Sequence, residues 1–330
     1  MDSRQRLREI DLAKGIGIIL VVAGHLVAGS PPRGNEWFLT FKGLLYSFHM
    51  PFFMYLSGYV YYYSGRYQVG RSEYPGFVWK LTKRLLVPFL ALGLITLIGK
   101  IVFSKFMYVD NPPAGLWEGV LQMIYFTRWS PATAIWYLFV LYVYSVLMPL
   151  VGRRFGMLYP VLLVAALLLW IYPLPPRIYG DRVSEFLLFF VLGMVACKFR
   201  GAWEPILKRF SLALVAAFAL ALFALTQVGS PWIVLACAIL GTAALHSITL
   251  HMDVEKYRPL VVIGEYSLVI YLLNTITIGL TKGVLLQFFS WNYGAFFVYL
   301  PLLMAGGLVL PMIARLLAEK FTPPVARYLR

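Results

Sequence analysis

The most constraining feature of the sequence is a pair of apolar segments, near residues 11–28 and 39–62, that also carry ionisable side chains. Each segment is long enough to cross the ~30 Å hydrocarbon core of a bilayer as a helix. The first holds Asp11, Lys14 and His25, and the second holds His49. Because an ionisable group inside a span is costly, it usually faces a protein interior or an aqueous path and marks function.

The spacing in the first segment predicts that its ionisable groups share one side of a single helix. Lys14 and His25 are eleven residues apart, which is about three helical turns, and Asp11 precedes Lys14 by about one turn. His25 is then expected roughly 16 Å beyond Lys14 along the helix axis. The sequence therefore predicts polar groups at two depths of the membrane.

Composition extends the membrane prediction to the whole chain. Apolar residues make up 61% of it and charged residues 13%, whereas a soluble domain carries about 25% charged residues. We expect an all-α, polytopic transmembrane helical bundle that forms a single domain over residues 1–330. Windows of about 20 apolar residues predict ten spans, near residues 11–28, 39–62, 81–103, 132–151, 157–172, 183–199, 210–227, 231–249, 260–281 and 294–317.

The distribution of Lys and Arg predicts the orientation. With the N-terminus inside, the inner segments hold 20 of the 29 basic residues and the outer segments hold 8, with Lys14 inside the first span. This bias predicts a multi-pass protein of the cell membrane with both termini in the cytoplasm. It also accounts for most of the net charge of +15, so no nucleic-acid partner is expected. Arg4, Arg6 and Arg8 precede the first span as in a signal peptide, but the charges inside that span predict a retained anchor.

Two motifs in residues 8–60 carry a resemblance to a known family. Lys14 followed after ten intervening positions by His25, and preceded by Arg8 and Asp11, resembles the first-helix motif of the acyltransferase-3 family. F-H-M-P-F-F with L-S-G-Y is similar to the second-helix motif of that family, and K-G-I-G-I-I-L-V-V resembles the branch related to fucose 4-O-acetylases.

Weaker similarities to the family follow along the chain at K-R-L-L-V-P-F, I-W-Y-L and G-E-Y-S-L-V-I-Y-L-L-N. Many relatives carry Arg where this chain has Lys14, which keeps the positive charge. Many also carry His where this chain has Asn274.

The resemblance implies an integral membrane enzyme that O-acylates cell-surface carbohydrates. Acetyl-CoA is then the expected acyl donor, and a lipid-linked or polymeric glycan is the expected acceptor, with membrane lipids around the bundle. Direct transfer and a transient acyl-histidine both fit the sequence, and either face of the membrane is compatible with the transfer. The sequence leaves the oligomeric state open. No group of His, Cys and carboxylate residues has metal-ligand spacing, so no metal is expected.

His25 is the leading candidate for the catalytic group, because a neutral imidazole can take a proton from an attacking hydroxyl. The alternative is a buried histidine bonded to a carbonyl. His49, just before Pro51, is expected to position the thioester or support His25, or to fill a structural kink. Asp11 completes the catalytic candidates.

Basic residues toward the cytoplasmic side are candidates for binding the phosphates of the donor, since cationic side chains suit phosphate oxygens. These are Lys14, Arg84 and Arg8. The alternatives are a local pair between Asp11 and Lys14 and ordinary topological charge.

Aromatic and amide side chains are candidates for binding the acceptor: Trp136, Tyr137, Tyr271 and Asn274. The alternatives are an interfacial aromatic belt and hydrogen bonds between helices. Ser57 could act as a nucleophile, although a serine in a span more often bonds back to a carbonyl.

Two other classes of protein compete with the enzyme. A transporter or flippase of a glycolipid or small molecule would also use many spans and intramembrane charge, but it predicts inverted repeats with matching broken helices. A receptor-like or scaffolding membrane protein would not need Lys14 and His25 on one helix side. The ionisable groups gather in the first two spans, which favours the enzyme.

Overall fold

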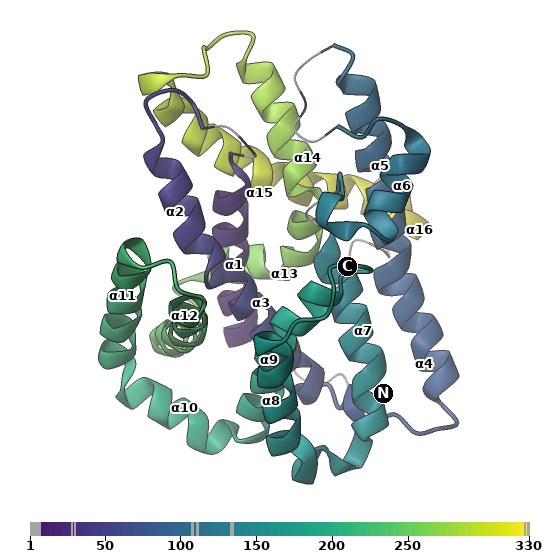
Figure 1. Ribbon diagram of the computed structural model, residues 1–330, viewed down its shortest axis with the longest axis vertical. Coiled ribbons are helices and arrows are strands. Elements are labelled where there is room, and N and C mark those ends of the chain that lie inside the picture. Colours follow the sequence, from purple (N-terminus) through teal and green to yellow (C-terminus); the bar gives the residue numbers. More distant parts are fainter. Residues whose placement is uncertain are drawn as a thin grey trace. The chain divides into compact units, whose positions relative to one another are not determined.

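The computed structural model describes residues 8–27, 29, 31–106, 109, 112–132, 135–326 and 328, so Arg4 and Arg6 lie outside the described residues. The described chain is built from helices, with one isolated bridge between Arg33 and Asn292 and no β-strand (Figure 1). The prediction of an all-α fold is confirmed. The chain divides into two compact units, Met1–Leu56 with Phe199–Arg330 and Ser57–Lys198.

The first unit contains most of the helices that carry the predicted site. Its elements are α1 (Arg8–His25), α2 (Trp37–Tyr46), the first half of α3 (His49–Tyr63), α10 (Arg200–Arg209), α11 (Ser211–Gln227), α12 (Pro231–His251), α13 (Arg258–Glu265), α14 (Ser267–Leu285), η5 (Tyr293–Ala295), α15 (Phe296–Phe321) and α16 (Pro323–Ala326).

Helix α1 is the central helix of this unit, because it packs against α2, α12, α13, α14 and α15. Acidic residues in its first turn, Glu9 and Asp11, suit the positive end of the helix dipole. Leu12, Ile18 and Val22 are fully buried. The helix is unbroken from Arg8 to His25, so the eleven-residue spacing does place Lys14 and His25 on one side of it.

Two glycines let α1 and α13 approach at backbone distance. A Cβ on Gly15 would overlap the carbonyl oxygen of Leu260, and a Cβ on Gly264 would overlap that of Asp11. Ten residues further along each chain segment, His25 bonds Asn274. The α13–α14 segment therefore runs parallel to α1, and the glycine contact sets the register between them.

The ninth predicted span is divided, because α13 ends at Glu265 and α14 begins at Ser267. Arg315 of α15 stabilises this break. Its guanidinium donates to the carbonyl of Glu265 at 3.4 Å and lies 4.5 Å from the ring centroid of Tyr266. A helix end inside a bundle needs such a donor for its unpaired carbonyls.

The second predicted span is also divided, at Ser47 and Phe48 between α2 and α3. Pro51 is the cause, since proline lacks the N–H needed in a helix interior and is accommodated in a first turn. Here Pro51 lies in the first turn of α3. We expected a kinked span, whereas the structure has two helices separated by a turn.

The second unit holds the rest of α3 and the helices that follow it. These are η1 (Arg66–Gln68), α4 (Tyr74–Leu81), η2 (Thr82–Leu86), α5 (Val87–Phe103), α6 (Leu116–Ile124), η3 (Thr127–Trp129), α7 (Trp136–Val151), η4 (Gly152–Arg154), α8 (Phe155–Ile171) and α9 (Gly180–Lys198).

The segment Thr82–Leu86 is a single wide π-type turn inside a continuous helix, with the N–H of Val87 bonded to the carbonyl of Thr82. Pro88 follows immediately and explains the turn, because its ring cannot pack over the carbonyl four residues earlier, which belongs to Arg84. The wide turn changes the direction in which Lys83 and Arg84 project from the helix.

Four helical segments in the described chain are long and apolar enough to cross a membrane: Tyr74–Phe103, Pro231–His251, Ser267–Leu285 and Tyr293–Phe321. A fifth is added if Gly180–Lys198 and Arg200–Arg209 form one span. Trp136–Val151, Phe155–Ile171 and Ser211–Gln227 are shorter apolar helices.

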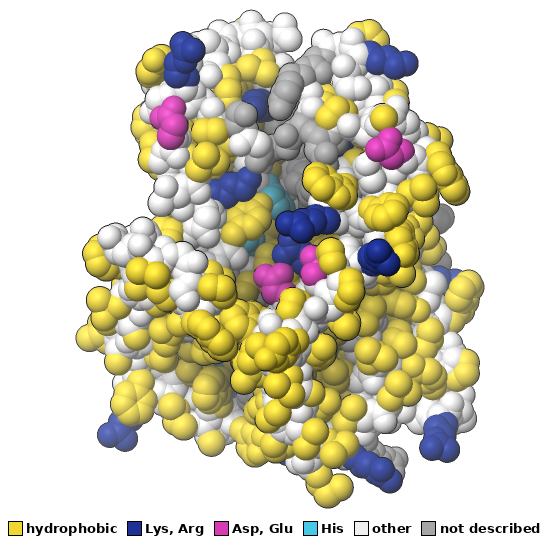
Figure 2. Space-filling model, viewed as in Figure 1, with side chains coloured by type: hydrophobic (Ala, Val, Ile, Leu, Met, Phe, Trp, Pro, Cys, Tyr) yellow, Lys and Arg dark blue, Asp and Glu magenta, His cyan; other side chains and the backbone are white. Residues whose placement is uncertain are grey.

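Large apolar side chains are exposed along several of these helices, including Ile95 of α5, Met157 of α8 and Leu212 of α11. Hydrophobic side chains cover much of the visible surface, and Lys and Arg side chains are sparse among them (Figure 2). Apolar surface of this extent is typical of helices that contact lipid.

Candidate functional site

The central feature of the first unit is the contact between His25, the last residue of α1, and Asn274 of α14. His25 Nδ1 lies 2.7 Å from Asn274 Oδ1. Asn274 is fully buried, and its amide nitrogen donates to the carbonyls of Ile270 at 2.9 Å and Tyr271 at 2.8 Å. The His25 side chain is half-buried. The late motif thus meets the first-helix motif in space.

Tyr46 of the second predicted span lies between His25 and His49. The rings of His25 and Tyr46 have centroids 6.5 Å apart in an edge-on arrangement, and those of Tyr46 and His49 are 4.9 Å apart, also edge-on. Tyr46 therefore contacts both histidines. The sequence patterns did not single it out, since an aromatic residue in a span is unremarkable.

His49 itself is buried, with Nδ1 2.6 Å from the carbonyl oxygen of Leu45. This carbonyl lies at the end of α2, where the turn before Pro51 interrupts the helical hydrogen bonds. The same carbonyl already accepts the N–H of Phe48 at 3.2 Å, so the imidazole is a second partner at the end of α2, which fits the structural alternative for this residue.

Lys42 belongs to the second predicted span and lies close to the end of α1. Its Nζ donates to the carbonyl of Val27 at 2.7 Å and sits 5.5 Å from the ring centroid of Tyr46. A cation at the C-terminal end of a helix satisfies its last carbonyls and suits its dipole. The sequence feature that could have selected Lys42 is its place as a lysine within an apolar segment.

At the other end of α1, the ionisable residues form pairs. Lys14 Nζ lies 3.2 Å from Oδ1 of Asp11, whose carboxylate is buried. Arg8 pairs with Glu255, from the connection between α12 and α13. Lys14 keeps two N–H donors beyond this ion pair, and part of its side chain is exposed. Arg8 would have to share or release Glu255 before it could bind a phosphate.

In the second unit, Arg84 has a basic neighbour that the sequence patterns did not select. Burial and then the positive charge of Arg84 lower the pKa of Arg66. Arginine side chains suit phosphate oxygens, so both residues are candidates for binding an anion. Arg66 is part of η1, so its nearness to Arg84 arises only from folding.

Two motif residues of the second unit bond each other. Ser57 Oγ, from the L-S-G-Y motif, lies 2.5 Å from the hydroxyl oxygen of Tyr137. Tyr137 is buried, so it packs within the protein rather than lining an open surface. The pair gives Ser57 a structural role that does not require it to be a nucleophile.

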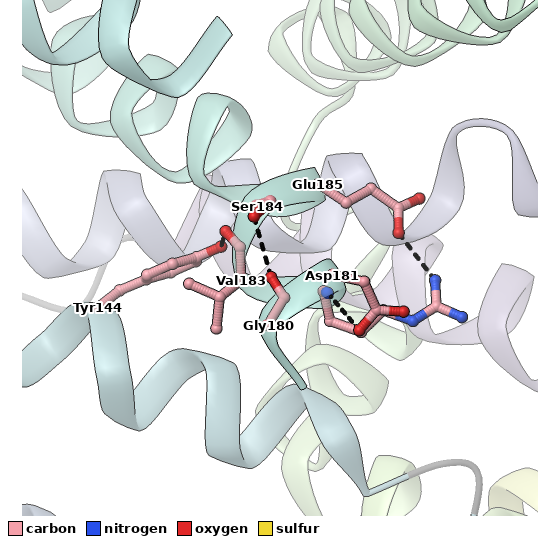
Figure 3. A network of polar contacts seen from close by, with 7 residues as sticks. Tyr144, Gly180, Asp181, Val183, Ser184 and Glu185 are labelled. Carbon is pink, nitrogen blue, oxygen red and sulfur yellow. Dashed lines mark hydrogen bonds and ion pairs between the residues drawn. The ribbon is translucent and has the colours of Figure 1, made fainter. Parts of the chain in front are cut away.

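Trp136 is half-buried beside the first turns of α9. Its indole stacks on Phe186 with ring centroids 4.7 Å apart, and the guanidinium of Arg182 lies 5.4 Å from its ring centroid. Arg182 also pairs with Glu185 at 2.8 Å, next to the bonds from Tyr144 to Val183 and from Ser184 to Gly180 (Figure 3). These contacts make a polar cluster that packs against the rings of Trp136 and Phe186.

Tyr271 is buried and lies one turn before Asn274 on α14. The structure thus joins His25 with Asn274, Asp11 with Lys14, and Ser57 with Tyr137. No group of three or more metal-ligating side chains occurs among the residues described.

Comparison with known proteins identifies the family. The model of the acyltransferase domain of the acyltransferase-3 family matches residues 7–316, nearly the whole chain. No curated protein and no solved structure matches this chain. The match includes both α1 and α14, which supply His25 and Asn274. The chain belongs to the acyltransferase-3 family, and its apolar helices make it a membrane acyltransferase.

Proposed function

We propose that this protein is an O-acetyltransferase that moves an acetyl group from cytosolic acetyl-CoA to a hydroxyl of a cell-surface or lipid-linked saccharide. The observation that carries the proposal is a half-buried imidazole, fixed by a side-chain hydrogen bond, at the end of the central helix of an acyltransferase. An imidazole held in one orientation is suited to general-base catalysis.

In the proposed reaction His25 is the general base. The saccharide hydroxyl gives its proton to the imidazole as its oxygen attacks the thioester carbonyl, and a C–O bond forms. The tetrahedral intermediate then breaks its C–S bond. The leaving thiolate takes the proton from the imidazolium, so the products are the acetyl ester and CoA with a free thiol. In this proposal His49 stabilises the turn between α2 and α3, and Asp11 orients Lys14 through their ion pair.

The donor phosphates are bound by basic side chains in this proposal. Lys14 of the first unit, with its two remaining N–H donors, is one candidate group, and Arg84 and Arg66 of the second unit are the others. The pantetheine arm then bridges the roughly 16 Å that separate Lys14 from His25 along α1. No metal takes part.

We also propose ten spans, both termini in the cytoplasm of a cell membrane, and one functional domain made of both units. The family match extends over both units. Helices α1 and α14 run parallel, so an odd number of crossings must separate them if both span the bilayer. The seven further spans predicted between them satisfy this condition.

The test uses purified protein in nanodiscs with radiolabelled acetyl-CoA and a membrane glycan extract. We expect transfer of label into the glycan by the wild type. His25→Ala should lower kcat by about 10²–10⁴-fold, the range for losing a general base, while binding of CoA is kept.

The matched control is His251→Ala, because His251 is exposed and its Nε2 is 3.2 Å from the Lys208 carbonyl oxygen. Full turnover by a folded His25→Ala protein would contradict the assignment of the base. A wild type that neither binds nor consumes acetyl-CoA would instead favour the glycolipid transporter or flippase.

A further inference from the structure

We propose that Asn274 is a positioning residue that holds His25 in the tautomer with its proton on Nδ1, so that Nε2 is the nitrogen that accepts the substrate proton. The consequence for turnover rests on the proposed function, whereas the tautomer is a property of the resting protein. The sequence left two alternatives for Asn274, binding of the acceptor or a hydrogen bond between helices, and its burial and its bond to His25 fit the second.

The orientation of the Asn274 amide is fixed by its own helix. Its nitrogen lies 2.9 Å from the carbonyl oxygen of Ile270 and 2.8 Å from that of Tyr271. Both carbonyl oxygens can only accept hydrogen bonds, so they require the NH₂ group there. The opposite orientation would place three acceptor oxygens together, Asn274 Oδ1 against the carbonyl oxygens of Ile270 and Tyr271. Oδ1 must therefore face His25.

The orientation of the amide determines the state of the imidazole. Asn274 Oδ1 carries no hydrogen, so the 2.7 Å contact is a hydrogen bond only if His25 Nδ1 donates. A neutral imidazole has one N–H, and its other nitrogen then carries a lone pair. That nitrogen is Nε2, and no hydrogen-bond partner for it occurs in the described part of the chain.

The packing of α1 against α13 fixes the position of the contact between His25 and Asn274. Gly15 and Gly264 bring the two backbones together and set the register ten residues before His25 and Asn274. Asn274 is 0% exposed, and both of its N–H groups are occupied. A positioning group held by packing and by hydrogen bonds keeps the base within the narrow geometry that catalysis requires.

An amide suits this place better than a carboxylate. A buried carboxylate inside a span would carry a large desolvation cost, and its second oxygen would face the Ile270 and Tyr271 carbonyls. Asparagine supplies the acceptor without the charge. It orients the base as the third member of a catalytic triad does.

The direct test is solid-state NMR of protein labelled with ¹⁵N at histidine only, in nanodiscs and without substrate. The chain has four histidines, and the His25 signals are identified by their absence in His25→Gln. We expect a protonated Nδ1 and an unprotonated Nε2 for His25. A protonated Nε2, or averaging between the two forms, overturns the proposal.

Three variants link the tautomer to turnover. Asn274→Leu keeps the volume but removes the acceptor, so we expect mixed tautomers and a kcat lower by about 10²–10⁴-fold, with little change in KM for acetyl-CoA. Asn274→Asp restores an acceptor oxygen when its other oxygen is protonated. It should recover the Nδ1–H form and at least ~10-fold of the lost kcat, since one general-base step contributes about 10²–10⁴-fold.

Thr277→Val is the matched control, because Thr277 lies one turn further on α14 and bonds only the carbonyls of its own helix. It should leave both the tautomer and kcat unchanged. An Asn274→Leu protein that keeps the Nδ1–H form and full kcat contradicts the proposal. If His25→Ala retains turnover, the general-base assignment fails, and the NMR result still decides the tautomer alone.

Discussion

Arg66 and Arg84 are the residues of the second unit in which position and charge most clearly suit an anion. Arg84 projects from the wide turn Thr82–Leu86, and Arg66 lies in η1. Burial, and then the positive charge of Arg84, lower the pKa of Arg66. A bound phosphate would form charge-assisted hydrogen bonds with either guanidinium.

We therefore predict that Arg84→Gln and Arg66→Gln each raise KM for acetyl-CoA by about 10-fold, because a hydrogen bond to a charged group contributes about 1.5–3 kcal/mol. The kcat at saturating donor should change little, since the phosphates lie away from the reacting atoms. Steady-state kinetics with labelled acetyl-CoA measure both constants.

Arg71→Gln is the control for this pair, since Arg71 is exposed in the same connection between η1 and α4. Its KM should match that of the wild type. Equal effects of all three substitutions would mean that only general positive charge matters, and the two-arginine site would be wrong.

At the residue scale the sequence identified His25 through its place in an apolar segment. The sequence could not predict that Asn274 bonds His25, because 249 residues separate the two and no local pattern links them. Tyr46, Lys42 and Arg66 were missed for the same reason. Their relevance comes from neighbours that only the fold supplies.

At the scale of the helices, the contact between α1 and α13 determines the geometry of the site. Gly264 lies against the backbone of α1, where a Cβ would overlap the carbonyl oxygen of Asp11. Backbone cannot move aside as a flexible side chain can, so the two helices would have to separate. Any separation also lengthens the contact between His25 and Asn274.

We predict that Gly264→Ala destabilises the protein by about 1–3 kcal/mol, the usual cost of overpacking, and lowers kcat. Gly279→Ala on α14 is the matched control, because a Cβ there meets nothing within 4 Å. It should leave stability unchanged or raise it by up to about 1 kcal/mol, as alanine favours a helix. Thermal unfolding in nanodiscs compares them, and equal Tm values would refute the close contact.

The breaks in the predicted spans also belong to this scale. Pro51 signalled the break between α2 and α3, although the sequence predicted a kink and the structure has two separate helices. No proline or glycine marks Tyr266 itself. The division of α13 from α14 depends on Arg315 of another helix, which a local pattern cannot predict.

For the whole molecule, the proposed topology makes an accessibility prediction. In a background with Cys197 and Cys237 replaced by Ala, cysteines are placed at Gly70 and Ser290, both exposed in connections between helices. With ten spans and a cytoplasmic N-terminus, a membrane-impermeant maleimide should label Ser290→Cys in intact cells. Gly70→Cys should react only after the membrane is opened. The reverse pattern would contradict the orientation.

The sequence by itself determined that this chain is helical, belongs in a membrane and carries ionisable side chains in its first two apolar segments. Composition and hydropathy are local properties, and burying a charge in lipid is costly wherever the helix lies. The tertiary structure decided which groups meet: His25 with Asn274, Lys14 with Asp11, and Ser57 with Tyr137. A hydrogen bond depends on distances of a few tenths of an ångström. Such distances are fixed only when packing, here at Gly15 and Gly264, sets the register of the helices.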